Sequence, residues 1–283
     1  MGGIIMCHSL NASVLQQFEQ CLKAEEKSQA TIEKYLHDVH CFVDFLADRE
    51  ISKEEVISYK DRLTQQYAPA SVNSMLAALN CFLRFLGLQS CCVRLLKVQR
   101  RIFSDEDREL SRQEYRRLVQ AAQNTRLSLV IQTICGTGIR VSELQHITVE
   151  AVHAGKAVVT CKNKTRIIFI PTTLQRQLKQ YIRKKGLQAG AVFVSKNGKP
   201  LNRSNIWRDM KALCGRAGVS EKKVYPHSLR HLFARTFYGL EKDIVKLADL
   251  LGHSSINTTR IYTMESGNQH IMRLEQVQKM LAT

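Results

Sequence analysis

Apolar positions recur at helical spacing through the first part of the chain. Within residues 30–50 they fall at i, i+3, i+4 and i+7, which places on one helix face Ile32, Tyr35, Leu36, Val39, Phe42, Val43 and Leu46. Ser52 with Glu55 makes a capping-box pattern that opens the next helix. Pro69 starts another helix, whose apolar stripe ends at Gly87. With a first helix near residues 12–25, the pattern predicts a compact four-helix unit.

The helical periodicity breaks over residues 89–110, which carry several basic residues and are predicted to be a linker. Ser111 with Glu114 then forms a second capping box, which opens a new unit. Helices are predicted there at residues 111–122, 126–136, 173–185, 203–216, 228–238 and 242–251.

The same unit also contains two patterns typical of strands. Two β-branched runs around the polar turn CKNKT, within residues 152–171, predict a β-hairpin. GAVFVS, followed by NGKP at residues 197–200, predicts another short strand and turn. The predicted fold is therefore mainly α with a small β component, in which a helical unit precedes a mixed α/β unit.

The charge of the chain is strongly positive, with a net +17 and a pI near 9.6. Residues 1–100 hold 11 Lys and Arg against 11 Asp and Glu, so residues 101–283 hold the remaining 31 basic and 14 acidic residues. A basic excess of this size indicates a polyanionic partner. Its position puts the strongest electrostatic attraction in the second unit.

Several classes of protein are disfavoured by what the sequence lacks. No apolar run approaches the roughly 18 residues of a membrane span, and the first residues do not form a signal peptide, so we expect a cytoplasmic protein with no membrane partner. Nine scattered cysteines without C-x-x-C spacing favour reduced thiols over disulfides or a metal site. Neither of the glycine-rich nucleotide-binding motifs G-x-x-x-x-G-K-[ST] and G-x-G-x-x-G occurs, so no cofactor is expected.

Four segments of the second part carry candidate chemistry. They are GTGIRVSEL with Arg140, the basic hairpin with Lys162, Lys164 and Arg166, PHSLRHLFAR with His227, Arg230 and His231, and LLGHSSINTTRIYT with His253 and Tyr262. Singly, each has an ordinary interpretation as a surface cation, a solvated lysine or a hydrogen-bonding helix face. Jointly they supply what phosphoryl transfer needs. Arginine forks grip phosphate oxygens, histidine and lysine move protons, and tyrosine attacks.

The last of these segments is itself a predicted helix end. Leu250 and Leu251 finish a helix, and Gly252 supplies a left-handed turn. Ser254 or Ser255 then caps a short helix that leads to Tyr262.

The order and wording of the segments resemble the tyrosine recombinase family, also called phage-integrase-type site-specific recombinases. That family shows an Arg in T-G-x-R-x-S-E-L, a hairpin Lys, H-x-L-R-H, and L-G-H with a Tyr nine residues after its His. Here these are residues 137–144, Lys162, residues 227–231, and residues 251–253 with Tyr262. The resemblance covers roughly residues 12–283. It implies a C-shaped DNA clamp made of an extension at 1–10, a core-binding domain at 11–90, a linker at 91–110, a catalytic domain at 111–265 and a C-terminal helix at 266–283.

The resemblance also implies a role for each site residue. Tyr262 is the nucleophile, which leaves a 3′-phosphotyrosine and a free 5′-hydroxyl. Lys162 is the general acid, and His227 is the general base or a phosphate ligand. The scissile phosphate is bound by Arg140, Arg230 and His253, and these residues are oriented by Glu143 and His231. Arg260 is a DNA-backbone or structural contact.

One departure from the family pattern leaves the general acid open. The hairpin reads C-K-N-K-T-R, a residue shorter than the family's G-K-G-N-K-x-R, so Lys164 is an alternative to Lys162. The tail leaves a similar choice. Its apolar face, Ile271, Leu274, Val277 and Leu281, packs either on its own domain or, as the resemblance implies, on a neighbouring protomer.

The expected function is site-specific DNA recombination through a Holliday junction, without metal or nucleotide. The short length favours a simple Xer-like enzyme that resolves dimers, or a mobile-element integrase, and does not separate the two. The expected partners are duplex DNA with inverted-repeat core sites and further copies of the chain, as a dimer on each site and a tetramer in the synapse. A partner recombinase or accessory protein is left open. The expected location is the nucleoid of a bacterial cell. The alternatives are a type IB topoisomerase and a DNA-binding protein with a silent site.

Overall fold

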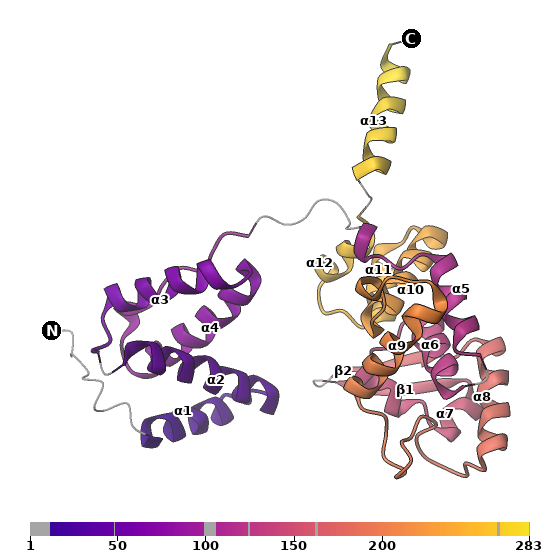
Figure 1. Cartoon of the computed structure of the whole chain (residues 1–283), viewed down its shortest axis with the longest axis horizontal. Coiled ribbons are helices and arrows are strands. Elements are labelled where there is room, and N and C mark those ends of the chain that lie inside the picture. The colour runs from indigo at the N-terminus through magenta and orange to yellow at the C-terminus, as the bar shows by residue number, and fades with distance from the viewer. Residues whose placement is uncertain are drawn as a thin grey trace. The chain divides into compact units, whose positions relative to one another are not determined.

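The computed structural model describes residues 12–47, 49–98, 106–123, 125–161, 164–264 and 267–282. The chain divides into two compact units, Met1–Arg100 and Arg101–Thr283 (Figure 1). The first unit consists of the helices α1 (Ala12–Ala24), α2 (Gln29–Leu46), α3 (Lys53–Gln66) and α4 (Pro69–Phe85). The predicted four-helix unit is therefore confirmed.

The core of the first unit is formed by the apolar faces that the sequence predicts. Phe42, Leu46, Leu76 and Leu79 are buried where α2 and α4 pack together. One detail at the start of α3 differs. The Ser52 hydroxyl accepts from the Glu55 backbone N–H, but the Glu55 carboxylate accepts from Arg49 at 2.6 Å, so the predicted capping box is only half formed in the described residues.

The chain that follows α4 stays attached to the first unit. After the short 3₁₀ turn η2 (Gln89–Cys91), Asn80 bonds both the N–H and the C=O of Val93, at 2.9 and 2.8 Å. Asn73 does the same for Leu96, at 2.7 and 3.0 Å. Each asparagine side chain thus satisfies the backbone N–H and C=O of one residue of the extended chain, as a neighbouring β-strand would. The beginning of the segment predicted as a linker is therefore held against α4.

The second unit is mainly helical and includes a small sheet with one face in the core and the other exposed. Its described α-helices are α5 (Arg112–Ala121), α6 (Arg126–Thr137), α7 (Val149–Ala154), α8 (Thr172–Lys185), α9 (Arg203–Ala217), α10 (Pro226–Glu241), α11 (Ile244–Leu251), α12 (Ile256–Thr259) and α13 (Gly267–Leu281). Its 3₁₀ helices are η3 (Glu106–Arg108), η4 (Val141–His146), η5 (Glu221–Lys223) and η6 (Arg260–Tyr262). α10 packs on α6, and α5 packs on α9. The Ser111–Glu114 capping box is confirmed, with bonds of 2.8 and 3.1 Å.

The predicted hairpin is present as β1 (Lys156–Cys161) and β2 (Lys164–Phe169), paired antiparallel with Arg166 opposite Val159. Side chains alternate between the core, as for Val159 and Ile168, and the exposed face, as for Ile167. The predicted strand within residues 190–195 is wrong. Its two ends form isolated bridges with different partners, Thr148 with Ala191 and Val194 with Pro200, so no continuous ladder forms.

The observed architecture is mainly α with a two-stranded sheet, as predicted. Among the described helices, none is both long enough and apolar enough to span a bilayer. The cysteines whose side chains the structure describes are free thiols.

Candidate active site

The turn after α6 places Arg140 beside a buried carboxylate. Gly138 ends α6 with φ of 64°, and a Cβ there would lie 2.5 Å from the Phe233 ring, so glycine is required. The Glu143 carboxylate accepts from the Arg140 backbone N–H and from its Nη1, each at 2.9 Å. Burial raises the pKa of Glu143, but the Arg140 backbone hydrogen bond and the charge of Arg166 outweigh it and lower the pKa overall. The carboxylate is therefore charged and holds Arg140 in place.

Arg230, on α10, is a cation that is only 1% exposed. Its Nη1 donates to the Gly138 carbonyl, and its Nη2 donates to the Leu251 carbonyl at 2.8 Å. Burial and the nearby charge of Arg140 lower the pKa of Arg230 to about 10, and the electrostatic effect of the neighbouring Tyr262 opposes part of this fall. Arg230 is thus protonated at neutral pH. Its hydrogen-bond partners in the described part of the chain are neutral, which leaves a buried positive charge for an anion.

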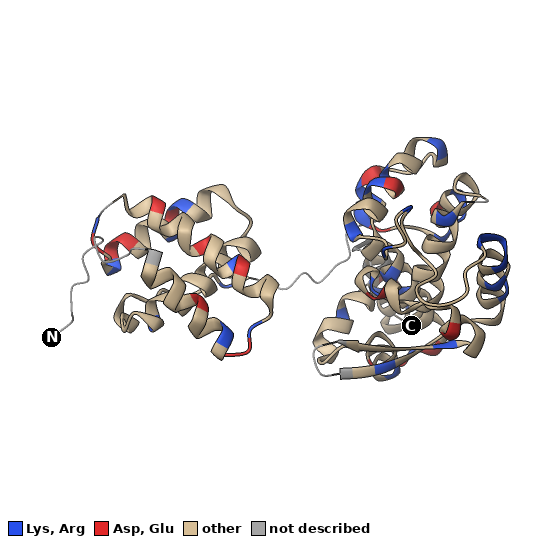
Figure 2. Cartoon of the chain, turned by 90° about the horizontal axis from the view of Figure 1, so that it is seen from below, with Lys and Arg blue, Asp and Glu red and all other residues tan. Residues whose placement is uncertain are grey.

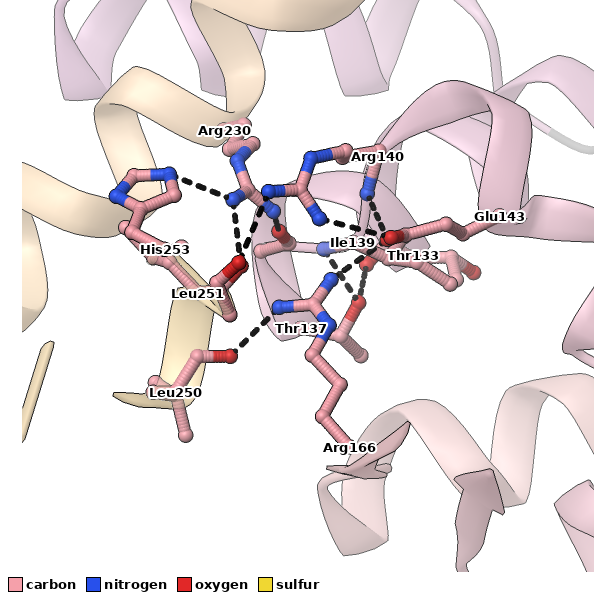
Figure 3. A network of polar contacts seen from close by, with 12 residues as sticks. Thr133, Thr137, Ile139, Arg140, Glu143, Arg166, Arg230, Leu250, Leu251 and His253 are labelled. Carbon is pink, nitrogen blue, oxygen red and sulfur yellow. Dashed lines mark hydrogen bonds and ion pairs between the residues drawn. The ribbon is translucent and has the colours of Figure 1, made fainter. Parts of the chain in front are cut away.

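Three arginines converge on the C-terminal end of α11 (Figure 3). The last carbonyl groups of a helix have no partner within the helix and carry the negative end of its dipole. The Leu250 carbonyl accepts from Arg166 at 2.8 Å, and the Gly252 carbonyl accepts from Arg140 at 3.3 Å. The Leu251 carbonyl between them accepts from Arg230. The end of this helix therefore arranges guanidinium groups from three distant segments around one point.

His253 follows this helix end and is held from both ring nitrogens. Its Nε2 lies 3.0 Å from Nη2 of Arg230, and its Nδ1 lies 2.8 Å from the hydroxyl of the buried Thr259. Burial, followed by the charges of Arg230 and Arg140, lowers the pKa of His253 to about 4, so the ring is neutral. Arginine only donates, which makes Nε2 the acceptor and puts the proton on Nδ1.

Tyr262 lies against the same cluster of side chains as His253. The predicted helix end is confirmed, since Gly252 adopts φ of 64° and Ser255 caps α12. η6 then brings Tyr262, 3% exposed, against the rings of His231 and His253, with centroids 4.6 and 5.9 Å away. His227 contacts the other side of His231, with centroids 4.7 Å apart. Segments separated by over a hundred residues thus bring Arg140, Glu143, His227, Arg230, His231, His253 and Tyr262 into one cluster.

The lysines of the hairpin are less well defined. Lys162 lies outside the described residues, so its role stays a prediction. Lys164 begins β2, where it pairs with Cys161. Arg166 is the residue whose importance the sequence reasoning missed, because it was grouped with the other hairpin cations. The strand alternation carried a signal, since Arg166 falls in phase with the buried residues Ile168 and Ile170.

The buried His231, which lies between His227 and Tyr262, predicts that the stability of the chain depends on pH. Burial, then His227 and Arg230, lower the pKa of His231 from 6.5 to about 4. Between these values the unfolded chain binds more protons, so the free energy of unfolding falls as pH drops from about 6.5 toward 4. We expect the loss of melting temperature between about pH 7 and pH 5 to be smaller in His231→Gln. An equal loss in the variant and the wild-type chain would refute this assignment.

Comparisons with known proteins identify the family to which the chain belongs. A model of the phage integrase family matches residues 108–269, and one of the phage integrase N-terminal SAM-like domain matches residues 15–89. The chain is 30% identical over 265 residues to tyrosine recombinase XerA of Pyrococcus furiosus, covering 90% of both chains.

Solved structures share the fold. A lambda integrase dimer bound to a COC′ core site has a TM-score of 0.74 at 20% identity, covering 93% of this chain and 97% of that one. A lambda integrase tetramer bound to a Holliday junction has a TM-score of 0.71 at 21% identity, covering 89% and 78%. From the sequence matches and the shared fold, the chain belongs to the phage integrase family of tyrosine recombinases.

Proposed function

We propose that the chain is a site-specific recombinase that cleaves and rejoins duplex DNA through a phosphotyrosine linkage. The observation that carries this is the buried Arg230 guanidinium, which bonds only neutral groups in the described part of the chain and lies near Tyr262. A nucleophile thus lies at the one cation best prepared for a phosphodiester.

In the proposed reaction, the phenol oxygen of Tyr262 attacks the scissile phosphorus, and the bond from phosphorus to the 5′ oxygen breaks. The products are a 3′-phosphotyrosine and a 5′-hydroxyl, and a 5′-hydroxyl from the other duplex reverses the step. Arg140 and Arg230 hold the charge that develops on the non-bridging oxygens. Because His253 is hydrogen-bonded to the buried Arg230 in the isolated chain, the incoming phosphate replaces that bond on the guanidinium.

The histidines have separate tasks in this scheme. Burial, followed by the charges of Arg230 and Arg140, lowers the pKa of His227, so its neutral ring can accept the phenol proton or contact the phosphate. His253 now accepts at Nε2 and cannot donate to a phosphate from that atom. An anion beside it raises its pKa, and protonation then turns Nε2 into a donor. Glu143 and His231 orient these groups, so their loss weakens cleavage without abolishing it.

The leaving 5′ oxygen needs a proton, and we assign it to Lys162. Lys162→Ala is expected to slow cleavage about 10²- to 10⁴-fold, the usual contribution of a general acid, while Lys164→Ala retains most activity. The measurement is the rate of covalent adduct formation on a nicked DNA substrate that cannot religate. Normal cleavage by Lys162→Ala together with loss in Lys164→Ala would reverse the assignment.

We also propose the division into an extension at 1–10, a core-binding domain at 11–90, a linker at 91–110, a catalytic domain at 111–265 and a C-terminal helix at 266–283. The basic second unit, rich in Lys and Arg in Figure 2, would face the phosphates. The first unit would bind the same duplex. Affinity should then fall steeply with added salt. The proposed setting is the bacterial cytoplasm, at the nucleoid, with inverted-repeat core sites as targets.

Helix α13 supports the proposed assembly into dimers and tetramers. Its apolar face is exposed, at 55% for Ile271, 55% for Leu274, 50% for Val277 and 81% for Leu281. An apolar helix face left exposed favours docking on a neighbouring protomer. Deleting residues 268–283 should therefore impair assembly of the paired-site complex more than binding to a single site, as measured by gel mobility. Equal loss of both would show that the helix serves its own domain.

The test of the proposed function separates it from a type IB topoisomerase. Supercoiled plasmids with no site, one site or two target sites are incubated with the protein. A recombinase converts only the two-site plasmid into resolved or inverted products. Relaxation of all three plasmids would favour the topoisomerase, and no reaction with any of them would favour a silent DNA-binding protein.

A further inference from the structure

Arg166 is a nearly buried cation to which the proposed mechanism gives no task. Its side chain is 13% exposed. Nη2 donates to Oε2 of Glu143 at 2.6 Å, and Nη1 donates to the Leu250 carbonyl at 2.8 Å (Figure 3). A short bond between two charged groups is among the strongest available to a protein. Arg166 thus joins β2 both to the carboxylate that holds Arg140 and to the end of α11.

The path of the Arg166 side chain leaves it little conformational freedom. Its stem passes over Gly252, where a Cβ would lie 2.6 Å from Cδ and 3.1 Å from Nε of Arg166. Gly252 also has φ of 64°, so glycine is required both for backbone conformation and for space. The arginine is therefore confined between two fixed elements of the site.

The other end of β2 leads to the turn that carries the hairpin lysines. Arg166 pairs with Val159, and β2 begins two residues earlier at Lys164. Because the β1–β2 ladder runs from Arg166 toward this turn, losing the Arg166 contact would free this part of the hairpin from Glu143. A general acid works only within hydrogen-bond reach of the leaving oxygen.

We propose that Arg166 is a positioning residue that holds the hairpin lysine at the scissile phosphate. This inference rests on the proposed function, in which that lysine protonates the 5′ oxygen. Arg166 itself does not touch the DNA. Without it, the hairpin loses its tie to Glu143 and α11, and the lysine is displaced from the leaving group. Displacements of about 1 Å can lower rates about 10²-fold.

The experiment compares two nicked substrates that trap the covalent adduct. One carries the ordinary 5′ oxygen at the scissile bond, and the other carries a bridging 5′ sulfur. The sulfur leaves as a thiolate, whose conjugate acid has a pKa near 8.5, so it needs no proton from the enzyme. A defect confined to the general acid is therefore rescued by sulfur, whereas a defect in phosphate binding is not.

Arg166→Ala is expected to slow cleavage of the oxygen substrate about 30- to 100-fold, and to cleave the sulfur substrate within about 3-fold of the wild-type rate. Arg166→Lys should behave similarly, because a single ammonium cannot bridge both acceptors, and it serves if the alanine variant fails to fold. Arg176→Ala is the matched control, since it removes the same charge from an exposed position on α8. It should cleave both substrates at the wild-type rate.

Two results would overturn the proposal. One is an equal slowing on both substrates, which would place the effect in the phosphate clamp or the fold. The other is wild-type cleavage of both. The double variant Lys162→Ala, Lys164→Ala separates these outcomes from failure of the proposed function. If sulfur does not rescue that variant, the general acid does not come from this hairpin, whatever Arg166 does.

Discussion

Arg230→Ala is expected to lower the rate of adduct formation about 10³-fold, while affinity for the target DNA changes far less. Arg230 is one of many cations in the second unit, so overall phosphate attraction survives its loss. Its fork, however, is the buried charge held by neutral partners beside the Tyr262 phenol. Removing a single preorganised donor to a transition-state oxyanion commonly costs about 10²- to 10³-fold, and this donor also carries a full charge.

The measurements are single-turnover cleavage of a nicked substrate and, separately, the binding constant by fluorescence anisotropy. Arg230→Lys should fall between the wild-type protein and the alanine variant, because it restores the charge without the fork. Arg117→Ala, at an exposed position on α5, is the matched control and should cleave normally. Cleavage by Arg230→Ala within a few-fold of wild type would contradict the proposed phosphate site.

Tyr262→Phe is expected to lower adduct formation by at least about 10⁴-fold, below detection in ordinary assays. The substitution removes the attacking oxygen and leaves the ring, which keeps its contacts with His231 and the cluster around Leu251. Melting temperature and DNA affinity should therefore stay near the wild-type values. The measurement is the fraction of labelled DNA that enters a denaturing gel as a protein adduct.

A nearby tyrosine provides the control for this substitution. Tyr238 lies on α10 and packs against the same buried cluster as Tyr262. Tyr238→Phe should form the adduct at the wild-type rate. Persistent adduct in Tyr262→Phe would show that another residue is the nucleophile.

Much of the fold can be predicted from the sequence, because local signals and burial agree. The stripe through Phe42 and Leu46 is core, Ser111 caps α5, and Gly252 ends α11, each as its local pattern predicts. The wrong predictions occur where a partner outside the local pattern determines the hydrogen bonding. Residues 190–195 have strand composition, but their two ends bond different partners. Glu55 fits a capping box, but Arg49 takes its carboxylate. The short helix α7 was not predicted, and its last residues overlap the predicted hairpin region, although Thr148 caps it.

For the candidate site as well, some features can be predicted from the sequence and others depend on the folded chain. The motifs name Arg140, Arg230, His253 and Tyr262 because each carries a reactive group at a recognisable spacing. They do not reveal that the carbonyls of Leu250, Leu251 and Gly252, at the end of α11, each accept a hydrogen bond from a different arginine. Backbone carbonyl acceptors cannot be recognised from the pattern of residue types, because every residue has one. The role of Arg166 depends on these acceptors and on a carboxylate 23 positions away, so it emerges only once the chain is folded.

The most direct test of the account identifies both partners of the covalent bond. The wild-type protein is trapped on a nicked target site, the complex is digested, and the cross-linked peptide is sequenced by mass spectrometry. The DNA is mapped in parallel to find which end is blocked. We expect the peptide that contains Tyr262, joined to a 3′ phosphate, with a free 5′-hydroxyl on the released strand. A bond to a different residue, or to the 5′ end, would contradict the account.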